Sequence, residues 1–465
     1  MIANNSAAVR MEIMEPRAKR GNKAFFWNGI CMLFAFAAAF ATIPAAHAQS
    51  VYAITGAKVY PVSGPPIEGA TVVIRDGKIA AVGKGVSVPP GAKVIEARGL
   101  EVYPGMFDAI TEMGLNEIGE GVPGSVDSHE LGEFNPDLVA ETAIQIESEH
   151  IPVVRVSGIT HVITAPGVGG GGFGGGAAEI IGGQASLINL AGWTPGEMDV
   201  KRSAAMIVNW PSQPGGGGRG GFGGGGNQPS AQEARQAYLK HMDDLSDWLD
   251  RARHYQLAMH NGTVSEEQRD LKLEALVPVV KGDLPLFIIT EDPRSIRDAV
   301  NFCDKNKVKM ILGTGTAALE VKDLLKEKNT PVVLQPTLTL VREEDDPYDL
   351  SLAMAGQLHA AGIKIAFGSY TNEFARRLSQ QAGNSVGFGL PHDEALKALT
   401  LYPAQMFGVD NELGSIEPGK MANLVVTNGD LLELNTEVKY LFIKGQLTSL
   451  DNRHLRLYEK YRKRP

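Results

Sequence analysis

The sequence predicts an α/β protein in which a (β/α)8 barrel of the TIM type is joined to a small composite β-sandwich built from both chain ends. Apolar strand-like runs alternate with helical patterns between about residues 104 and 410, and this alternation is typical of a parallel sheet. Two β-patterned blocks, residues 49–103 and 411–465, flank that region, and each is too short to bury a good core alone. We therefore expect the two blocks to fold together.

The N-terminal block has the pattern of a small antiparallel sheet. Its β-branched, partly alternating runs are separated by glycine and proline and lie at residues 51–60, 70–75 and 78–82. Asp76-Gly77 lies between the last two runs, and an Asp-Gly pair favours a tight two-residue hairpin.

The C-terminal block repeats this pattern. We expect strands at residues 424–427 and 440–444, with Asn428-Gly429 at a turn between them. The basic tail, residues 453–465, is interpreted as a solvated helix end.

The middle of the chain supplies the predicted barrel, residues 104–410. The expected strands are residues 158–164, 286–290, 310–313, 331–334 and 363–367. The expected helices are residues 232–258, 293–306, 317–328, 348–361 and 391–401. Two glycine-rich tracts, residues 167–176 and 215–226, interrupt this pattern. Neither lies between a strand and a helix as a dinucleotide-binding loop would, so we interpret both as surface loops.

Residues 1–48 predict a signal peptide, and hence an exported, periplasmic protein. Basic residues precede an apolar run at 24–43, Pro44 follows it, and Ala46-His47-Ala48 has the small-x-small pattern of a cleavage site. Cleavage would leave Gln49 as the first residue. The alternative is an uncleaved membrane anchor, because about 20 apolar residues can span a bilayer.

Charge and cysteine content exclude some classes of partner and of stabilisation. The net charge of the whole chain is −9, which argues against nucleic acid as a partner. Of the two cysteines, Cys31 lies in the predicted signal peptide, so Cys303 has no partner for an internal disulfide after cleavage.

Isolated candidate residues in the barrel region give weak signals. His129-Glu130 lacks the HExxH pattern of a metalloprotease, and no serine lies in a GxSxG turn. His161 lies in an apolar run and Cys303 on an amphipathic helical pattern, so we interpret both as core residues.

Several short motifs lie in the two flanking blocks and at the borders of the predicted barrel. They are IRDGKI at 74–79 followed by VG at 82–83, YPGMFD at 103–108, TLYPA at 400–404 and LGSIEPGK at 413–420. In this order they resemble the amidohydrolase superfamily, particularly its imidazolonepropionase-like branch. The resemblance implies a barrel with a composite β-sandwich, and hydrolysis of non-peptide carbon–nitrogen bonds by a metal-bound hydroxide.

The metal-binding positions of that family are altered here. The family's first barrel strand ends Asp-x-His-x-His, and both histidines point into the barrel mouth because strand side chains repeat every two residues. This chain has Asp108, Ile110 and Glu112 at these positions. The spacing is retained, but an isoleucine cannot bind a metal.

The remaining family positions differ as well. By the resemblance, two more histidines should follow later strands, where this chain has Glu291 and Thr314. The family's catalytic aspartate should stand where this chain has Tyr370. The degenerate motif therefore leaves Glu112 and Glu291 as the candidate metal ligands, which would suit Mg²⁺ or Ca²⁺ better than zinc. The alternative is that both carboxylates are hydrated residues lining a cleft.

Two functions follow as hypotheses. The first is a metal-dependent hydrolase of carbon–nitrogen bonds with an altered site, as the resemblance implies. The second is a non-catalytic member that binds a small molecule in the barrel mouth, as a homo-oligomer or as the partner of an active relative. Ile110, Glu112, Glu291, Thr314 and Tyr370 are the candidate pocket residues in both cases, because each ends or follows a separate predicted strand.

Overall fold

The computed structural model describes residues 51–118, 125–168, 179–211, 213, 230–340 and 344–464. The predicted signal peptide and nearly all of both glycine-rich tracts lie outside the described residues. Across the described ranges, no helix is both long and apolar enough to cross a bilayer.

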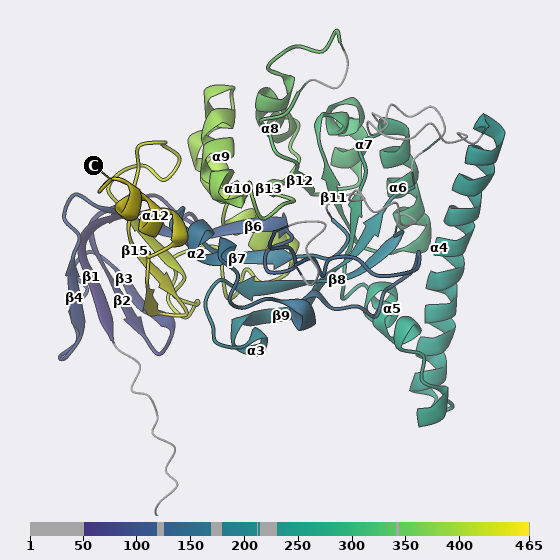
Figure 1. Ribbon diagram of the computed structural model, residues 1–465, viewed down its shortest axis with the longest axis horizontal. Helices are drawn as coiled ribbons and strands as arrows, with labels where there is room; N and C mark the ends of the chain where they lie inside the picture. The colour runs from purple at the N-terminus through teal and green to yellow at the C-terminus, as the bar shows by residue number, and fades with distance from the viewer. Residues whose placement is uncertain are drawn as a thin grey trace, which may run out of the picture. The chain divides into compact units, whose positions relative to one another are not determined.

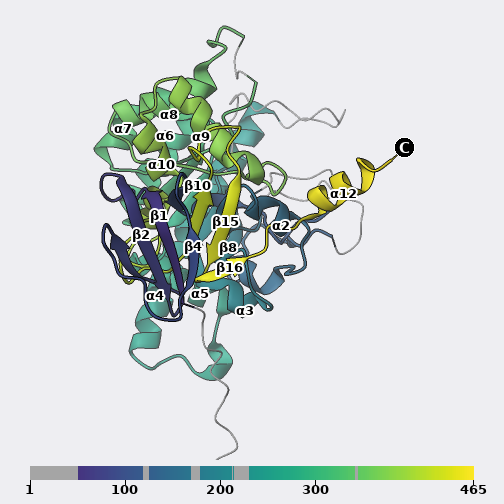
Figure 2. The ribbon, with the colours of Figure 1, turned by 90° about the vertical axis from the view of Figure 1, so that its left-hand side faces the viewer.

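Strands from both ends of the chain form one hydrogen-bonded sheet, in which the purple N-terminal and yellow C-terminal strands lie together (Figures 1 and 2). Its strands are β1 (Tyr52–Val59), β2 (Ile67–Arg75), β3 (Lys78–Gly83), β4 (Lys93–Glu96), β5 (Glu101–Pro104), β14 (Leu424–Thr427), β15 (Val438–Ile443) and β16 (Gln446–Thr448). The order is β16-β15-β14-β5-β1-β2-β3, with β4 beside β1. The antiparallel pair β5–β14 joins the two ends. A two-layered sandwich stays a prediction.

The composite sheet buries one apolar cluster drawn from both ends. Ile54, Val72, Val426 and Phe442 are fully buried within it. Because side chains alternate between the two faces of a strand, the partly alternating runs deliver these residues to one side.

The hairpin between β2 and β3 has the predicted turn. Asp76 has φ +52° and Gly77 has φ +76°, the left-handed pair that a type I′ turn requires. Arg75 and Lys78 face each other across it. The Asp-Gly prediction is confirmed.

A second sheet of eight strands forms the barrel. Its strands are β6 (Met106–Thr111), β7 (Ile159–Thr164), β8 (Ile181–Asn189), β9 (Asp199–Asn209), β10 (Leu286–Ile289), β11 (Met310–Thr314), β12 (Val332–Leu334) and β13 (Ile365–Phe367). They pair in sequence order from β6 to β13. Beyond β13, the amide of Tyr370 donates to the carbonyl of Ile110 in β6 at 2.9 Å, so the sheet is nearly closed.

The barrel departs from a regular (β/α)8 arrangement at β8. This strand is antiparallel to both β7 and β9, so the expected all-parallel sheet is wrong here. Only the short α3 (Pro195–Met198) separates β8 from β9, and antiparallel neighbours need no long crossover helix. The strand escaped sequence analysis because Gly182-Gly183 lies at its start and glycine weakens a strand pattern.

Helices pack outside the parallel strands, with α4 as the longest (Figure 1). These helices are α2 (His150–Arg155), α4 (Ala231–His260), α5 (Leu271–Lys281), α6 (Pro293–Asn306), α7 (Lys322–Glu327), α8 (Leu350–Ala360), α9 (Leu378–Gly387), α10 (His392–Ala398) and α11 (Leu401–Met406). The last helix, α12 (Arg453–Tyr461), follows the composite sheet and contacts α2. The predicted helix at 293–306 is confirmed to the residue. It begins at the cap Asp292, whose carboxylate accepts from the amide of Ser295 at 2.9 Å.

Two predicted helices are interrupted. The pattern at 317–328 forms a 3₁₀ segment, Thr316–Val321, followed by α7. The pattern at 391–401 ends at Ala398, and α11 begins three residues later. Pro403 has no N–H for the carbonyl of Leu399, and that carbonyl accepts from the amide of Phe107 at 2.8 Å instead. The interruption between α10 and α11 therefore allows a hydrogen bond between Leu399 and Phe107 of β6.

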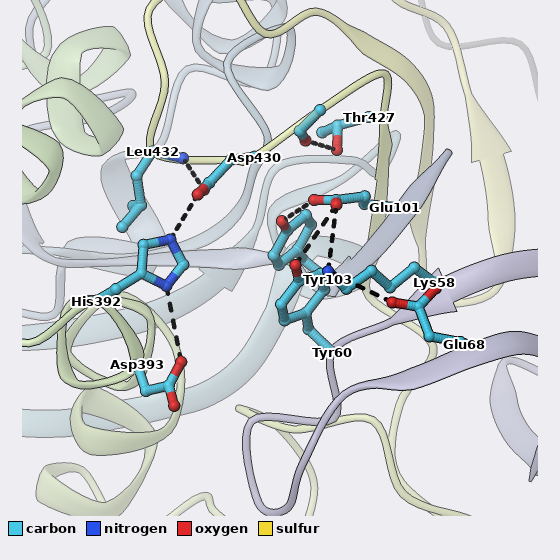
Figure 3. Close-up of polar contacts among 11 residues, drawn as sticks. Lys58, Tyr60, Glu68, Glu101, Tyr103, His392, Asp393, Thr427, Asp430 and Leu432 are labelled. Carbon is cyan, nitrogen blue, oxygen red and sulfur yellow. Dashed lines mark hydrogen bonds and ion pairs between the residues drawn. The ribbon is translucent and has the colours of Figure 1, made fainter. Parts of the chain in front are cut away.

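Polar contacts link the composite sheet to the helix layer (Figure 3). His392 of α10 lies 2.6 Å from Asp430, in the loop after β14. On the sheet itself, the Tyr60 and Tyr103 rings stack with centroids 4.5 Å apart, and both hydroxyls donate to Glu101.

Candidate functional site

The barrel mouth, meaning the C-terminal ends of β6 and β10–β13, is where the structure places the predicted pocket positions. Ile110 lies in β6, and Thr314 is the last residue of β11; both are fully buried. Glu112 directly follows β6 and is 4% exposed, whereas Glu291, after β10, is exposed. Tyr370 follows β13 and is 7% exposed.

Tyr370 turns inward from the mouth. Its backbone has φ +59°, which is unusual for a bulky residue, and its hydroxyl donates to the carbonyl of Val333 at 3.0 Å. Glycines make room for it: a Cβ on Gly313 would lie 2.7 Å from the Tyr370 hydroxyl, and one on Gly368 would lie 3.1 Å from its ring. The tyrosine ring therefore fills space at the end of the barrel core, beside Ile110.

Two carboxylates, Glu291 and Asp108, act electrostatically on the buried hydroxyl of Tyr370. Burial, followed by the charges of Glu291 and Asp108, holds the pKa of Tyr370 well above its usual range. Glu291 itself accepts a hydrogen bond from the Gln335 side chain at 2.6 Å. Gln335 could not be predicted as a site residue, because nothing in its local sequence pattern marks it.

The structure brings some of the predicted pocket positions into contact, but it shows no side-chain hydrogen bond for Thr314 among the described residues. A backbone hydrogen bond joins Tyr370 to Ile110, and burial together with the charge of Glu291 raises the pKa of the Tyr370 hydroxyl. The hydroxyl of Thr314 is buried and has no hydrogen-bond partner within the described ranges.

Asp108 occupies the interior of the barrel. One carboxylate oxygen accepts from the amide of Ser369 at 2.9 Å, and the other is buried without a hydrogen-bond partner among the described residues. Burial raises the pKa of Asp108 to about 7 against the opposing effect of the Ser369 hydrogen bonds. This aspartate therefore exchanges its proton near neutral pH while remaining inaccessible to solvent.

His161 is a core residue, in agreement with its interpretation from sequence. Burial lowers its pKa to about 3, so the ring is neutral. The Thr160 hydroxyl lies 2.6 Å from Nδ1 and the Asn423 amide 3.3 Å from it, so Nδ1 accepts and Nε2 carries the proton. The ring also lies against Phe107, with centroids 4.5 Å apart.

An additional pair of functional groups lies at the same end of the barrel. His129 Nδ1 is 3.4 Å from the buried carboxylate of Glu179, which also accepts from the Glu130 amide at 2.6 Å. The amide side chain of Asn209, the last residue of β9, donates to the carbonyls of Gly167 and Glu179 and holds this pair near the strand ends. Sequence analysis considered His129 but missed Glu179, which lies 50 residues away.

The donor set at the mouth does not fit the zinc site of the resembled family. The candidate positions supply carboxylate, hydroxyl and phenol oxygens and no imidazole, whereas zinc sites favour histidine and cysteine. Within the part of the chain that the structure describes, no three His, Cys, Asp or Glu side chains form a metal-binding group.

Comparison with known proteins gives partial matches. The model of the Amidohydrolase family matches residues 295–448. A putative N-acetylgalactosamine-6-phosphate deacetylase from Escherichia coli strain K12 is 41% identical over 96 residues, which is 20% of this chain and 53% of that protein. Adenine deaminase 3 from Rhizobium meliloti strain 1021 is 41% identical over 64 residues, 14% of this chain and 10% of that protein. The chain thus spans about half or less of these relatives.

Solved structures share the fold over most of the chain. An amidohydrolase from Thermotoga maritima MSB8 has a TM-score of 0.71 at 24% identity, covering 86% of this chain and 99% of its own. Molinate hydrolase has a TM-score of 0.54 at 17% identity, covering 86% of this chain and 95% of its own. The sequence of residues 295–448 therefore resembles the Amidohydrolase family, and the chain shares its fold with these solved structures.

Proposed function

We propose that this chain is an exported amidohydrolase-superfamily protein of the imidazolonepropionase-like branch, whose barrel binds a small molecule and does not hydrolyse carbon–nitrogen bonds. The observation that carries the proposal is the position of Tyr370. By the resemblance, it takes the place of the family's catalytic aspartate, and its ring and hydroxyl are packed into the end of the barrel. A phenol kept neutral by burial cannot replace a carboxylate base near neutral pH.

The altered donor set predicts weak binding of transition metals. Wild-type protein should hold zinc, iron and manganese well below one ion per chain after purification, since the candidate ligand positions in the mouth supply oxygen ligands only. The double variant Ile110→His and Glu112→His restores two imidazoles at family spacing. It should bind zinc at least about tenfold more tightly in a competition titration with a chromophoric chelator.

A matched variant, Ile110→Asn with Glu112→Asn, controls for polarity at the same positions. It should bind zinc no better than wild type, and circular dichroism should show that both variants fold. One tightly bound zinc per chain in the unmodified protein would overturn the proposal.

The second candidate function is retained hydrolysis, which the His129–Glu179 pair favours. A carboxylate that orients an imidazole is an arrangement used for general base catalysis, and this pair lies at the barrel end where such enzymes work. The relatives act on N-acetylgalactosamine 6-phosphate and adenine by their names, so these are the compounds to assay. Turnover by wild type that His129→Gln abolishes, while His254→Gln does not, would establish this alternative over the binding role.

Export and assembly are part of the proposal. Edman sequencing of protein from the periplasm of its native host should begin at Gln49, because the small-x-small motif ends at Ala48. A membrane-bound form that retains residues 1–48 would instead identify an anchor. We propose a homo-oligomer or an active relative as the protein partner, and no nucleic acid.

A further inference from the structure

A cavity of about 650 Å³ lies at the opposite end of the barrel from the mouth. Its lining includes Pro285, Met310, Pro331 and Ile363, which start or precede β10, β11, β12 and β13. The volume lies in the range of small-molecule sites. This end of a barrel ordinarily contributes stability, so a ligand site here would be separate from the candidate site described above.

Positive charge dominates this cavity. Five lysines line it together with two aspartates, Asp283 and Asp304, although the whole chain has a net charge of −9. The lysines, which we call the basal lysines, are Lys201, Lys309, Lys326, Lys328 and Lys364. They come from β9, from α7 and its C-terminal end, and from the residues before β11 and β13, so only the fold collects them.

Most of this positive charge is not neutralised by the protein. Lys328 pairs with Asp304 at 2.9 Å, and Lys364 donates to the amide oxygen of Gln405 at 2.8 Å. The side chains of Lys309 and Lys326 form no ion pair or hydrogen bond within the described residues. The cavity therefore holds two unpaired ammonium groups, and a third, that of Lys364, donates a hydrogen bond only to the neutral Gln405 side chain among the described residues. Binding of an anion would be electrostatically favourable there.

Lys201 adds to the excess of positive charge in the cavity. It is partly buried, and among the described residues its ammonium group donates only to the backbone carbonyl of Phe407, at 2.8 Å. Burial, and then repulsion from Lys309, lowers the pKa of Lys201. Two like charges therefore face one space, and an anion between them would stabilise both.

The floor of the cavity is apolar. Met310 and Met406 line it and are partly exposed, whereas Ile311, Leu325 and Phe407 are each at most 2% exposed and add little accessible surface. A ligand that carries only charge would leave this surface uncovered. A ligand with an apolar body and a charged head would use both parts, because apolar contact contributes favourably in proportion to the area covered.

We propose that the basal lysine cavity binds a small organic phosphate, with its dianionic head among Lys201, Lys309 and Lys326 and its apolar body against Met310 and Met406. Lysine ammonium groups act as point charges toward phosphate and need no planar geometry. The proposal does not depend on the function of the barrel mouth, since the two sites lie at opposite ends of the strands.

Calorimetric titration of the purified protein with phenyl phosphate, inorganic phosphate and benzoate tests the proposal. Phenyl phosphate should bind, and more tightly than inorganic phosphate, because only the former covers the apolar floor. Benzoate has the same ring with a single charge and should bind more weakly. Benzoate affinity equal to that of phenyl phosphate, or no heat of binding for phenyl phosphate at millimolar concentration, would refute the assignment.

Variants locate the binding at this cavity. Lys309→Gln with Lys326→Gln should weaken phenyl phosphate binding about tenfold without affecting the fold, because both side chains are exposed and unpaired in the described structure. The control pair Lys84→Gln with Lys463→Gln removes equal charge elsewhere and should change the affinity less than about twofold. Equal weakening by both pairs would show non-specific charge attraction and overturn the proposal.

Chemical modification gives an independent readout. Phenyl phosphate should protect Lys309 and Lys326 from acetylation and leave Lys84 unprotected, as measured by mass spectrometry of peptides. Protection of Lys84 to the same degree would contradict a site at the basal lysine cavity.

Discussion

Gly105→Ala should destabilise the protein by about 3 kcal/mol, the upper part of the range for overpacking a buried position. Gly105 joins β5 of the composite sheet to β6 of the barrel, and its amide donates to the carbonyl of Asn423 at 2.8 Å. A Cβ there would lie 2.8 Å from the Cβ of Thr160 and closer still to its hydroxyl. Because the clash reaches Thr160 Cβ, a rotamer change cannot relieve it, and the backbone must shift.

Urea unfolding followed by circular dichroism measures this effect. Gly64→Ala is the matched control, since a Cβ at Gly64 would meet nothing within 4 Å, and it should change the free energy of unfolding by less than about 0.5 kcal/mol. Thr160→Ala in the Gly105→Ala background should recover part of the loss, because it removes two of the clashing atoms. Similar decreases in the free energy of unfolding for Gly105→Ala and Gly64→Ala would contradict the close packing of Gly105 against Thr160.

Asp108→Asn should gain stability relative to wild type as the pH rises from about 4 to about 8. The pKa of Asp108 is raised from its ordinary value of 3.8 to about 7, so the folded protein retains a proton that the unfolded chain releases. The stability contributed by this proton is complete below pH 3.8 and is lost as the pH rises through 7. The loss is on the order of 4 kcal/mol, and asparagine does not titrate.

Denaturant midpoints of the two proteins at pH 4.5, 6 and 8 would measure this difference. Ser369 can still donate to the asparagine side-chain oxygen, so the interior hydrogen bond need not be lost. A constant difference between the two proteins across this pH range would show that Asp108 does not titrate between the two states in the expected way.

The pH dependence of wild-type stability alone would not reveal the Asp108 contribution, because His161 contributes a dependence of opposite sign. Its pKa is lowered to about 3 by burial, so between pH 3 and 6.5 the unfolded chain binds a proton that the folded one does not. This linkage makes stability rise with pH, while Asp108 makes it fall over nearly the same interval. The two slopes oppose each other, and the comparison with Asp108→Asn cancels the histidine contribution because both proteins contain it.

The sequence alone determined the local elements of this protein. The Asp76-Gly77 hairpin follows from turn chemistry, and the helix Pro293–Asn306 follows from its aspartate cap and its periodic apolar residues. The strands β7, β10 and β11 were predicted within one residue at each end. These features depend on neighbours along the chain, so a linear pattern contains the information that specifies them.

The tertiary structure alone decided which residues meet. The antiparallel insertion of β8, the approach of Glu179 to His129, and the packing of Tyr370 against Val333 join residues distant in sequence. So does the gathering of the basal lysines at the strand starts. Their positions depend on strand order and on how side chains fill a shared interior. Spacing along the chain records neither, and the candidate sites at both ends of the barrel could be assembled only after folding.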